Sequence, residues 1–299
     1  MYLLVAFLVP LFSGMSVIIE TMLSNKTFKH PTTMVFYVSL SSALFLPLVL
    51  FYGMPTLPSV QLFACYVALA AINVGYLYPY YLALKVIDTS IVAALFALGQ
   101  ISVPIMSYFW LGERLELTQY IGFAVIVMAS VALSVKGNRI PKLSKAFYYM
   151  VFAAIINSMT CVLEKYALNV DGNWINLAIY PGVIAGFMPF AFLVVKKWRK
   201  DIARNFPPYK SKLRLFVLIN ITEQMKNVVL FVSFIGLMAS IYSLVGLSPV
   251  VTTSVSSTEP MFVLAMSYLM CKCFKMCLSE QISAKVMVKK MFCFVLIVL

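Results

Sequence analysis

The amino-acid sequence consists of two copies of one unit. The tripeptide Met-Ser-Tyr at 106–108 recurs at 266–268, which is 160 positions later, and the segments around it, 86–100 and 246–260, align without a gap. Near the start of the chain, residues 15–20 align with residues 159–164 at an offset of 144. We therefore predict two domains with one common fold, residues 1–137 (the first copy) and residues 138–299 (the second copy).

The composition predicts that these copies lie in a membrane. Hydrophobic residues make up 63% of the chain and charged residues 11%, and the mean hydropathy is +0.96. In soluble globular domains the charged share is about 25%. The chain must therefore bury its apolar surface in lipid, as a multi-pass protein that we expect in the cell membrane.

Ten apolar segments have a length that suits membrane-spanning helices, which need about 20 residues each. They are residues 2–22, 33–52, 60–80, 88–111, 117–135, 146–167, 174–195, 215–236, 246–270 and 286–299. Five fall in each copy, and because five is odd, the second copy enters the bilayer from the opposite side. The predicted fold is an all-α membrane protein of two inverted five-helix repeats. Its last helix is short or truncated, because only residues 291–299 are continuously apolar there.

The distribution of basic residues predicts the orientation. Loops that follow odd-numbered spans contain 20 of the 23 Lys and Arg residues, whereas loops that follow even-numbered spans contain only Arg114 and Lys165. Cytoplasmic loops of membrane proteins are rich in Lys and Arg. We therefore expect both termini to lie outside the cell. The net charge of +13 is explained by the lipid bilayer, whose anionic headgroups would be the partner of the basic loops. We expect no nucleic-acid binding.

Short motifs recur in the same order in both copies. In the first, Ala83-Leu84-Lys85 precedes Thr89-Ser90 and Leu111-Gly112-Glu113-Arg114-Leu115; in the second, Leu247-Ser248-Pro249-Val250 precedes Ser257-Thr258-Glu259-Pro260. In order and spacing, these motifs resemble the EamA-type transporters of the drug/metabolite transporter superfamily. The second copy departs from this pattern, since residues 271–280 replace the Gly-Glu-Arg motif.

The resemblance implies a carrier that moves small solutes by alternating access without ATP. Its central cavity would be formed by the third, fourth, eighth and ninth helices, with contributions from the first and sixth. Inverted repeats are themselves typical of secondary transporters, with the binding site near the middle of the membrane. Amino-acid-like, nucleoside-like and drug-like solutes all remain open, as do a monomer and a homodimer.

Polar residues in the eighth span are the first candidates for lining this cavity. Asn220, Glu223, Lys226 and Asn227 share one face of a helix, and the predicted span places them near mid-depth in the bilayer. Ionisable residues at such depth normally face a cavity or a partner. The alternative is that Glu223 and Lys226, three residues apart, pair within the helix and only stabilise packing.

The remaining candidates lie on four other spans. Glu259 is near the middle of the ninth span and precedes Pro260, while Asn73, Tyr76 and Gln100 lie on the third and fourth. An aromatic belt at the membrane interface is the alternative for Tyr76. Glu20 and Glu164 occupy matching positions in the two copies and are candidate gates, one at each mouth of the cavity, or carboxylates that only extend to the interface.

These observations predict a secondary transporter of small metabolites, with protons as an open coupling partner at Glu223 or Glu259 and with no cofactor. The chain contains one histidine and no glycine-rich phosphate loop, so we expect no enzyme activity. Cys271, Cys273 and Cys277 match no common zinc spacing, and we expect no metal site. The alternative is a membrane sensor or scaffold that retains the fold without transporting.

Overall fold

A computed structural model describes residues 2–26, 28, 30–86, 89–100, 102–112, 145–205, 221–256 and 258–274, and the isolated positions 117, 118, 121, 125, 288 and 292. Every element in these residues is a helix, in agreement with the predicted all-α class. In the first copy the elements are α1 (Tyr2–Lys26), α2 (Pro31–Ser39), η1 (Leu40–Phe45), α3 (Leu48–Tyr52), α4 (Val60–Gly75), α5 (Leu77–Leu84), α6 (Thr89–Gln100) and α7 (Ser102–Leu111). In the second copy they are α9 (Lys145–Asp171), α10 (Trp174–Phe187), η2 (Met188–Val194), α11 (Lys196–Asn205), α12 (Ile221–Gly246), α13 (Pro249–Ser256) and α14 (Glu259–Phe274).

Several of these helices are long and apolar enough to cross a bilayer. Among the described residues, the six such segments are Tyr2–Asn25, Pro31–Phe51, Val60–Leu84, Phe147–Asp171, Trp174–Val194 and Val228–Gly246. They support a multi-pass membrane protein. Most of the predicted fifth span and of the predicted tenth span lies outside the described residues, so the total of ten helices stays a prediction.

The structure changes two predicted boundaries. Helix α12 ends at Gly246, ten residues after the predicted end at 236, because the apolar sequence continues without a break. The predicted ninth span is two helices, α13 and α14, with Thr258 in a turn between them. Pro260 lies in the first turn of α14, where a missing N–H costs no helical hydrogen bond.

The helices of the two copies occur at matching positions along the chain. Thr89 and Pro249, the first residues of α6 and α13, are 160 positions apart, as in the sequence repeat. The long helices α1 and α9 begin each copy, and a helix followed by a 3-10 segment comes next in both, α2 with η1 and α10 with η2. These elements therefore follow a similar order in the two predicted copies, although α4 and α5 of the first correspond in position to the single helix α12 of the second.

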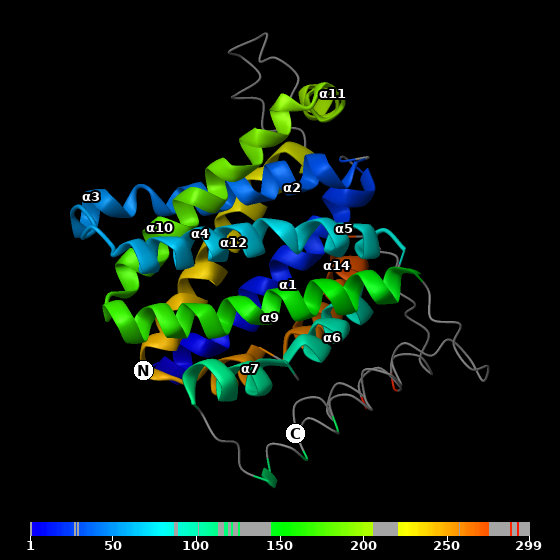
Figure 1. The fold of residues 1–299 in the computed structure, drawn as a ribbon. Coiled ribbons are helices and arrows are strands. Elements are labelled where there is room, and N and C mark those ends of the chain that lie inside the picture. Colours follow the sequence, from blue (N-terminus) through cyan, green and yellow to red (C-terminus); the bar gives the residue numbers. More distant parts are fainter. Residues whose placement is uncertain are drawn as a thin grey trace.

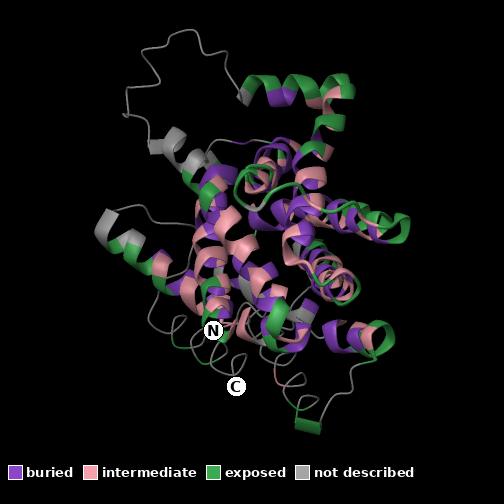
Figure 2. Ribbon diagram, turned by 90° about the vertical axis from the view of Figure 1, so that its left-hand side faces the viewer, coloured by how far each residue is buried: buried purple, intermediate pink, exposed green. Residues whose placement is uncertain are grey.

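Helix α1 runs through the middle of the bundle, where it packs mainly along α12 and also against α14 (Figure 1). Helix α9 packs against α4, α5, α6 and α7, and α10 packs against α4 and η1. Most of the buried side chains are apolar, and many large apolar side chains are exposed, as expected for lipid contact. Figure 2 shows the buried residues toward the inside of the bundle and the exposed ones toward its outside.

Two opposite ends of the bundle can be distinguished by their hydrogen bonds. At the first, Lys85 Nζ donates to the Phe28 carbonyl at 3.2 Å, and His30 Nε2 lies 3.8 Å from Asp201 Oδ1 of α11. We call this the basic end, because it also carries the cationic helix α11; partial burial there lowers the pKa of the Lys85 ammonium. The loops that it gathers follow odd-numbered spans.

The other end, which we call the opposite end, gathers the loops that follow even-numbered spans. There the Tyr66 hydroxyl donates to Asp171 Oδ2 at 3.3 Å. Asn176 Nδ2 donates to the same carboxylate at 2.7 Å and to the Thr56 hydroxyl at 2.6 Å. Among the described residues, loops of these two classes therefore lie at separate ends of the molecule.

Candidate solute cavity

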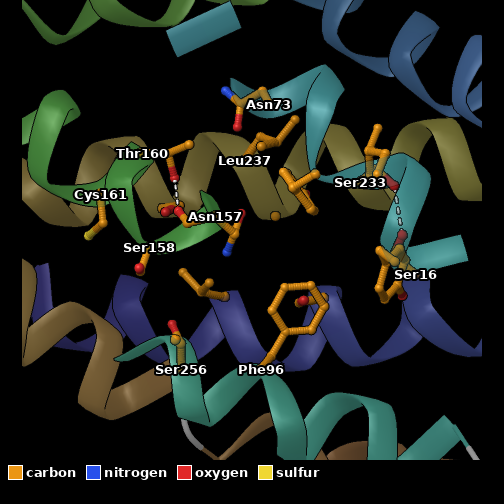
Figure 3. A pocket seen from close by; sticks show the side chains of 18 of the residues that line it. Ser16, Asn73, Phe96, Asn157, Ser158, Thr160, Cys161, Ser233, Leu237 and Ser256 are labelled. Carbon is orange, nitrogen blue, oxygen red and sulfur yellow. Dashed lines mark hydrogen bonds between the residues drawn. The ribbon is translucent and has the colours of Figure 1, made fainter. Parts of the chain in front are cut away.

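A cavity of about 280 Å³ lies in the centre of the bundle, between α1, α9, α12 and the α4–α5 and α13–α14 segments. Figure 3 shows Asn73, Asn157 and Phe96 directed toward it from α4, α9 and α6. Residues of both predicted copies contribute to its wall.

The lining residues of α1 and α9 occupy equivalent positions in the two copies. Four pairs, each 144 positions apart, line the cavity: Ser13 and Asn157, Ser16 and Thr160, Val17 and Cys161, and Glu20 and Glu164. One face of the first helix of each copy is thus used in the same way.

The same relation holds for the later helices, at an offset of 160. The pairs are Asn73 and Ser233, Tyr76 and Gly236, Leu77 and Leu237, Tyr80 and Ser240, Phe96 and Ser256, and Gly99 and Glu259. The first copy contributes the aromatic member of three pairs and the second copy a small residue. The cavity wall is therefore symmetric in position but not in chemistry, with aromatic rings on one side and hydroxyls with an additional carboxylate on the other.

Glu20 lies in a network of hydroxyl groups and is only 6% exposed. Ser16 Oγ donates to Glu20 Oε1 at 2.9 Å and lies 2.7 Å from Ser233 Oγ of α12. Because a serine hydroxyl carries one proton, Ser16 accepts from Ser233 while it donates to Glu20. The hydroxyls of Tyr80 and Tyr81 lie beside the same carboxylate without forming a hydrogen bond of good geometry to it.

Glu259 is held from the same helix, one turn earlier. Ser13 Oγ donates to Glu259 Oε2 at 2.8 Å. Glu259 is the first residue of α14, where the helix dipole stabilises a negative charge. Ser13 and Ser16, three residues apart on one face of α1, therefore hold one carboxylate each.

Glu164 lines the cavity without a hydrogen bond of this kind among the described residues. Its neighbour Lys165 does not neutralise it, since Lys165 Nζ donates to the carbonyls of Leu244 at 2.8 Å and Leu247 at 3.0 Å. Within the described part of the chain, no basic side chain forms an ion pair with Glu20, Glu164 or Glu259.

Comparison with known proteins identifies the first part of the chain. Residues 1–136 match the EamA-like transporter family. This match confirms the EamA resemblance found in the sequence motifs and is consistent with a membrane transporter. A search of the curated proteins finds no match.

The fold of nearly the whole chain is similar to that of a solved structure. This structure, described only as a crystal structure of a protein, superposes with a TM-score of 0.63 over 98% of this chain and 93% of that chain. The two sequences are 14% identical, so the similarity concerns the fold alone. The structural similarity continues past residue 136, so it includes the second copy, which the family match does not cover.

The cavity brings together five of the residues predicted from the sequence: Asn73, Tyr76, Glu259, Glu20 and Glu164. The side chains of Gln100, Asn220, Glu223, Lys226 and Asn227 lie outside the described residues. Their roles as lining residues therefore stay a prediction.

Several lining residues were not predicted, among them Ser13, Ser16, Asn157 and Ser233. Small hydroxyl and amide side chains are common on packed membrane helices, so their residue types give no signal for a cavity. The repeat offsets could have found them, because each is paired by its offset with another polar lining residue. No cluster of three or more metal-binding side chains occurs in the described residues.

Proposed function

We propose that the chain is a secondary active transporter that moves a small polar metabolite by alternating access. The observation that supports this proposal is the central cavity, whose lining residues include pairs at matching positions of the two predicted copies. In transporters built from inverted repeats, solute binds where the repeats meet, and rocking of one against the other exposes the site to each side in turn.

The hydrogen bonds at the two ends supply candidate closing contacts. At the basic end these are the contacts of Lys85 with Phe28 and of His30 with Asp201. At the opposite end they include the contact of Gln61 Nε2 with the Tyr166 hydroxyl at 3.3 Å. Each contact joins helices that must separate if that end is to open, so the two sets would form and break alternately.

The solute would contact Asn73 and Tyr76 of the first copy and Glu259 of the second. Glu20 and Glu164 would serve as gates, since they come from equivalent positions on α1 and α9 and contact the cavity from the two copies. Gln100, Asn220, Glu223, Lys226 and Asn227 remain proposed lining residues. Proton uptake at Glu259 or Glu223 would couple solute movement to the proton gradient.

The basic end would face the cytoplasm, with both termini outside and the protein in the cell membrane. The support for this orientation is the concentration of Lys and Arg in the loops that gather at that end.

Distance measurements between spin labels test alternating access without knowledge of the solute. One doubly labelled variant would carry labels at positions 30 and 201 of the basic end, and a second at positions 61 and 166 of the opposite end. If the protein is a carrier, each variant should show a short and a long distance between its labels. When solute is added, the share of the short distance should rise at one end and fall at the other. A single distance at both ends under all conditions would support the alternative, a membrane sensor or scaffold that keeps this fold without transporting.

A further inference from the structure

The charge of the cavity wall is one-sided. Glu20, Glu164 and Glu259 line it, whereas no Lys, Arg or His does so among the described residues. Carboxylates shielded from water need a cationic partner, a proton or several hydrogen bonds, because burying an unpaired charge is costly. Glu259 and Glu20 each receive one serine hydrogen bond, and the Tyr80 and Tyr81 hydroxyls also lie beside Glu20, but neither carboxylate has a cationic partner among the described residues.

Three further polar groups of the cavity wall have no hydrogen-bond partner in the described part of the protein. They are the hydroxyls of Ser39, Tyr80 and Thr252, whose residues are 4%, 3% and 2% exposed. Buried hydroxyls are nearly always hydrogen-bonded in folded proteins. Together with the free lone pairs of the carboxylates, they provide acceptors for a ligand that donates several hydrogen bonds.

The aromatic residues of the first copy lie next to this acidic region. Tyr76 and Phe96 meet edge to face with ring centroids 6.2 Å apart, and Tyr80 lies 5.3 Å from Phe96. Tyr76 is within electrostatic range of all three carboxylates. Aromatic faces attract cations, most strongly where water is excluded, so this side of the cavity also favours positive charge.

We propose that the cavity selects a small organic cation with a protonated amine. Its ammonium group would lie between Glu20 and Glu259 and donate to their free oxygens, and its apolar part would lie against Tyr76 and Phe96. This pair of carboxylates is favoured because adjacent turns of α1 hold both of them, through Ser16 and Ser13. The volume of about 280 Å³ is close to the lower limit of about 300 Å³ for small-molecule sites, which favours a small solute.

This inference rests on the proposed function and names the class of its solute. Three probes that share one ring and one chain length separate charge from shape: tyramine carries an ammonium group, tyrosol a hydroxyl, and 4-hydroxyphenylacetate a carboxylate. Binding of each to the purified full-length protein in detergent would be measured by calorimetry. Tyramine should bind at least about tenfold more tightly than tyrosol, and the acid should not bind.

Variants then locate the site. Glu20→Gln and Glu259→Gln should each weaken tyramine binding by about tenfold or more, because a charge-assisted hydrogen bond is replaced by a neutral one. Lys200→Gln is the control, since Lys200 is exposed on α11, does not line the cavity and takes part in no proposed closing contact, and this variant should bind as the unmodified protein does.

The comparison of the three probes needs no variant, so it remains decisive if a glutamate substitution prevents folding. Equal binding of tyramine and tyrosol, tighter binding of the acid, or no binding of tyramine would overturn the proposal. The spin-label distances address transport separately. Two populations at each end together with acid-selective binding would retain the carrier and reject the organic cation as its solute.

Discussion

Ser13 of α1 and Glu259 of α14 are joined by a hydrogen bond of 2.8 Å across 246 positions of sequence. The bond connects the first helix of the first copy to the point at which the ninth predicted span breaks into two helices. A break of this kind exposes backbone groups that a continuous membrane helix would satisfy internally, and it is tolerated where it lines a cavity.

Replacement of Ser13 by alanine should therefore affect both stability and solute binding. The substitution removes the donor from a carboxylate, and hydrogen bonds to charged groups contribute about 1.5–3 kcal/mol. We expect a lower thermal midpoint of the detergent-purified protein and weaker binding of tyramine. Ser42→Ala is the matched control, because Ser42 also lines the cavity but makes no hydrogen bond to a carboxylate in the described structure. Equal effects of the two substitutions would contradict the role of the Ser13 hydroxyl.

Gly99 and Gly236 both line the cavity but should respond differently to a methyl group. A Cβ at Gly99 would collide with the backbone carbonyl of Ala154 on α9, whereas at Gly236 the nearest atom is Phe12 Cβ at 3.6 Å. Overpacking of a helix contact costs about 1–3 kcal/mol. We expect Gly99→Ala to lower the thermal midpoint by several degrees and Gly236→Ala to leave it almost unchanged.

The Gly236→Ala variant should instead alter solute affinity, because its methyl group would be added to the cavity wall. Gly236 is the second copy's equivalent of Tyr76, at the offset of 160. Gly75→Ala provides the reference, because a Cβ there would meet no atom within 4 Å. Tyramine affinity measured in the three alanine variants checks this expectation. A Gly99→Ala protein as stable as the Gly75→Ala protein would show that α6 and α9 do not pack as closely as described.

Lys165 should stabilise the opposite end of the bundle. Its ammonium group donates to the carbonyls of Leu244 and Leu247, which are at the C-terminal end of α12 and have no helical N–H partners. A cation at a helix C-terminus is also favoured by the helix dipole. Lys165→Met keeps the length of the side chain and removes both hydrogen bonds, so we expect a loss of about 1–2 kcal/mol, measured as a decrease in the thermal midpoint. If Lys165→Met and Lys165→Arg were equally stable, the cationic contacts would have no such role.

The sequence predicts the fold of this protein better than it predicts the residues of the cavity. Apolar length and the repeat offsets predicted the helical class and the approximate positions of most described helices, because burial in lipid requires long apolar segments. The break before Glu259 was not predicted, although Pro260 was recognised, since proline in a membrane helix produces a kink as readily as a complete interruption.

For the site, sequence reasoning favoured charged residues and overlooked hydroxyls. Glu259 was named because charge inside a membrane is costly and therefore conspicuous, and Glu20 and Glu164 were named because they occupy matching positions in the two copies. Their partners Ser13 and Ser16 were overlooked, because a serine on a membrane helix can equally satisfy the backbone or allow close packing. Whether two such residues lie at 2.8 Å depends on how helices from different copies pack, and a single sequence contains no direct record of that packing.

The orientation in the membrane can be tested at two exposed positions. Leu57 is 94% exposed at the opposite end, and Arg199 is exposed on α11 at the basic end. In a background without the six native cysteines, Leu57→Cys should react with a membrane-impermeant maleimide in intact cells, whereas Arg199→Cys should react only after the cells are permeabilised. This expectation follows because Lys and Arg are retained on the cytoplasmic side during insertion. The reverse pattern would place the basic end outside, and labelling of both cysteines in intact cells would show that the two ends do not lie on opposite sides of the bilayer.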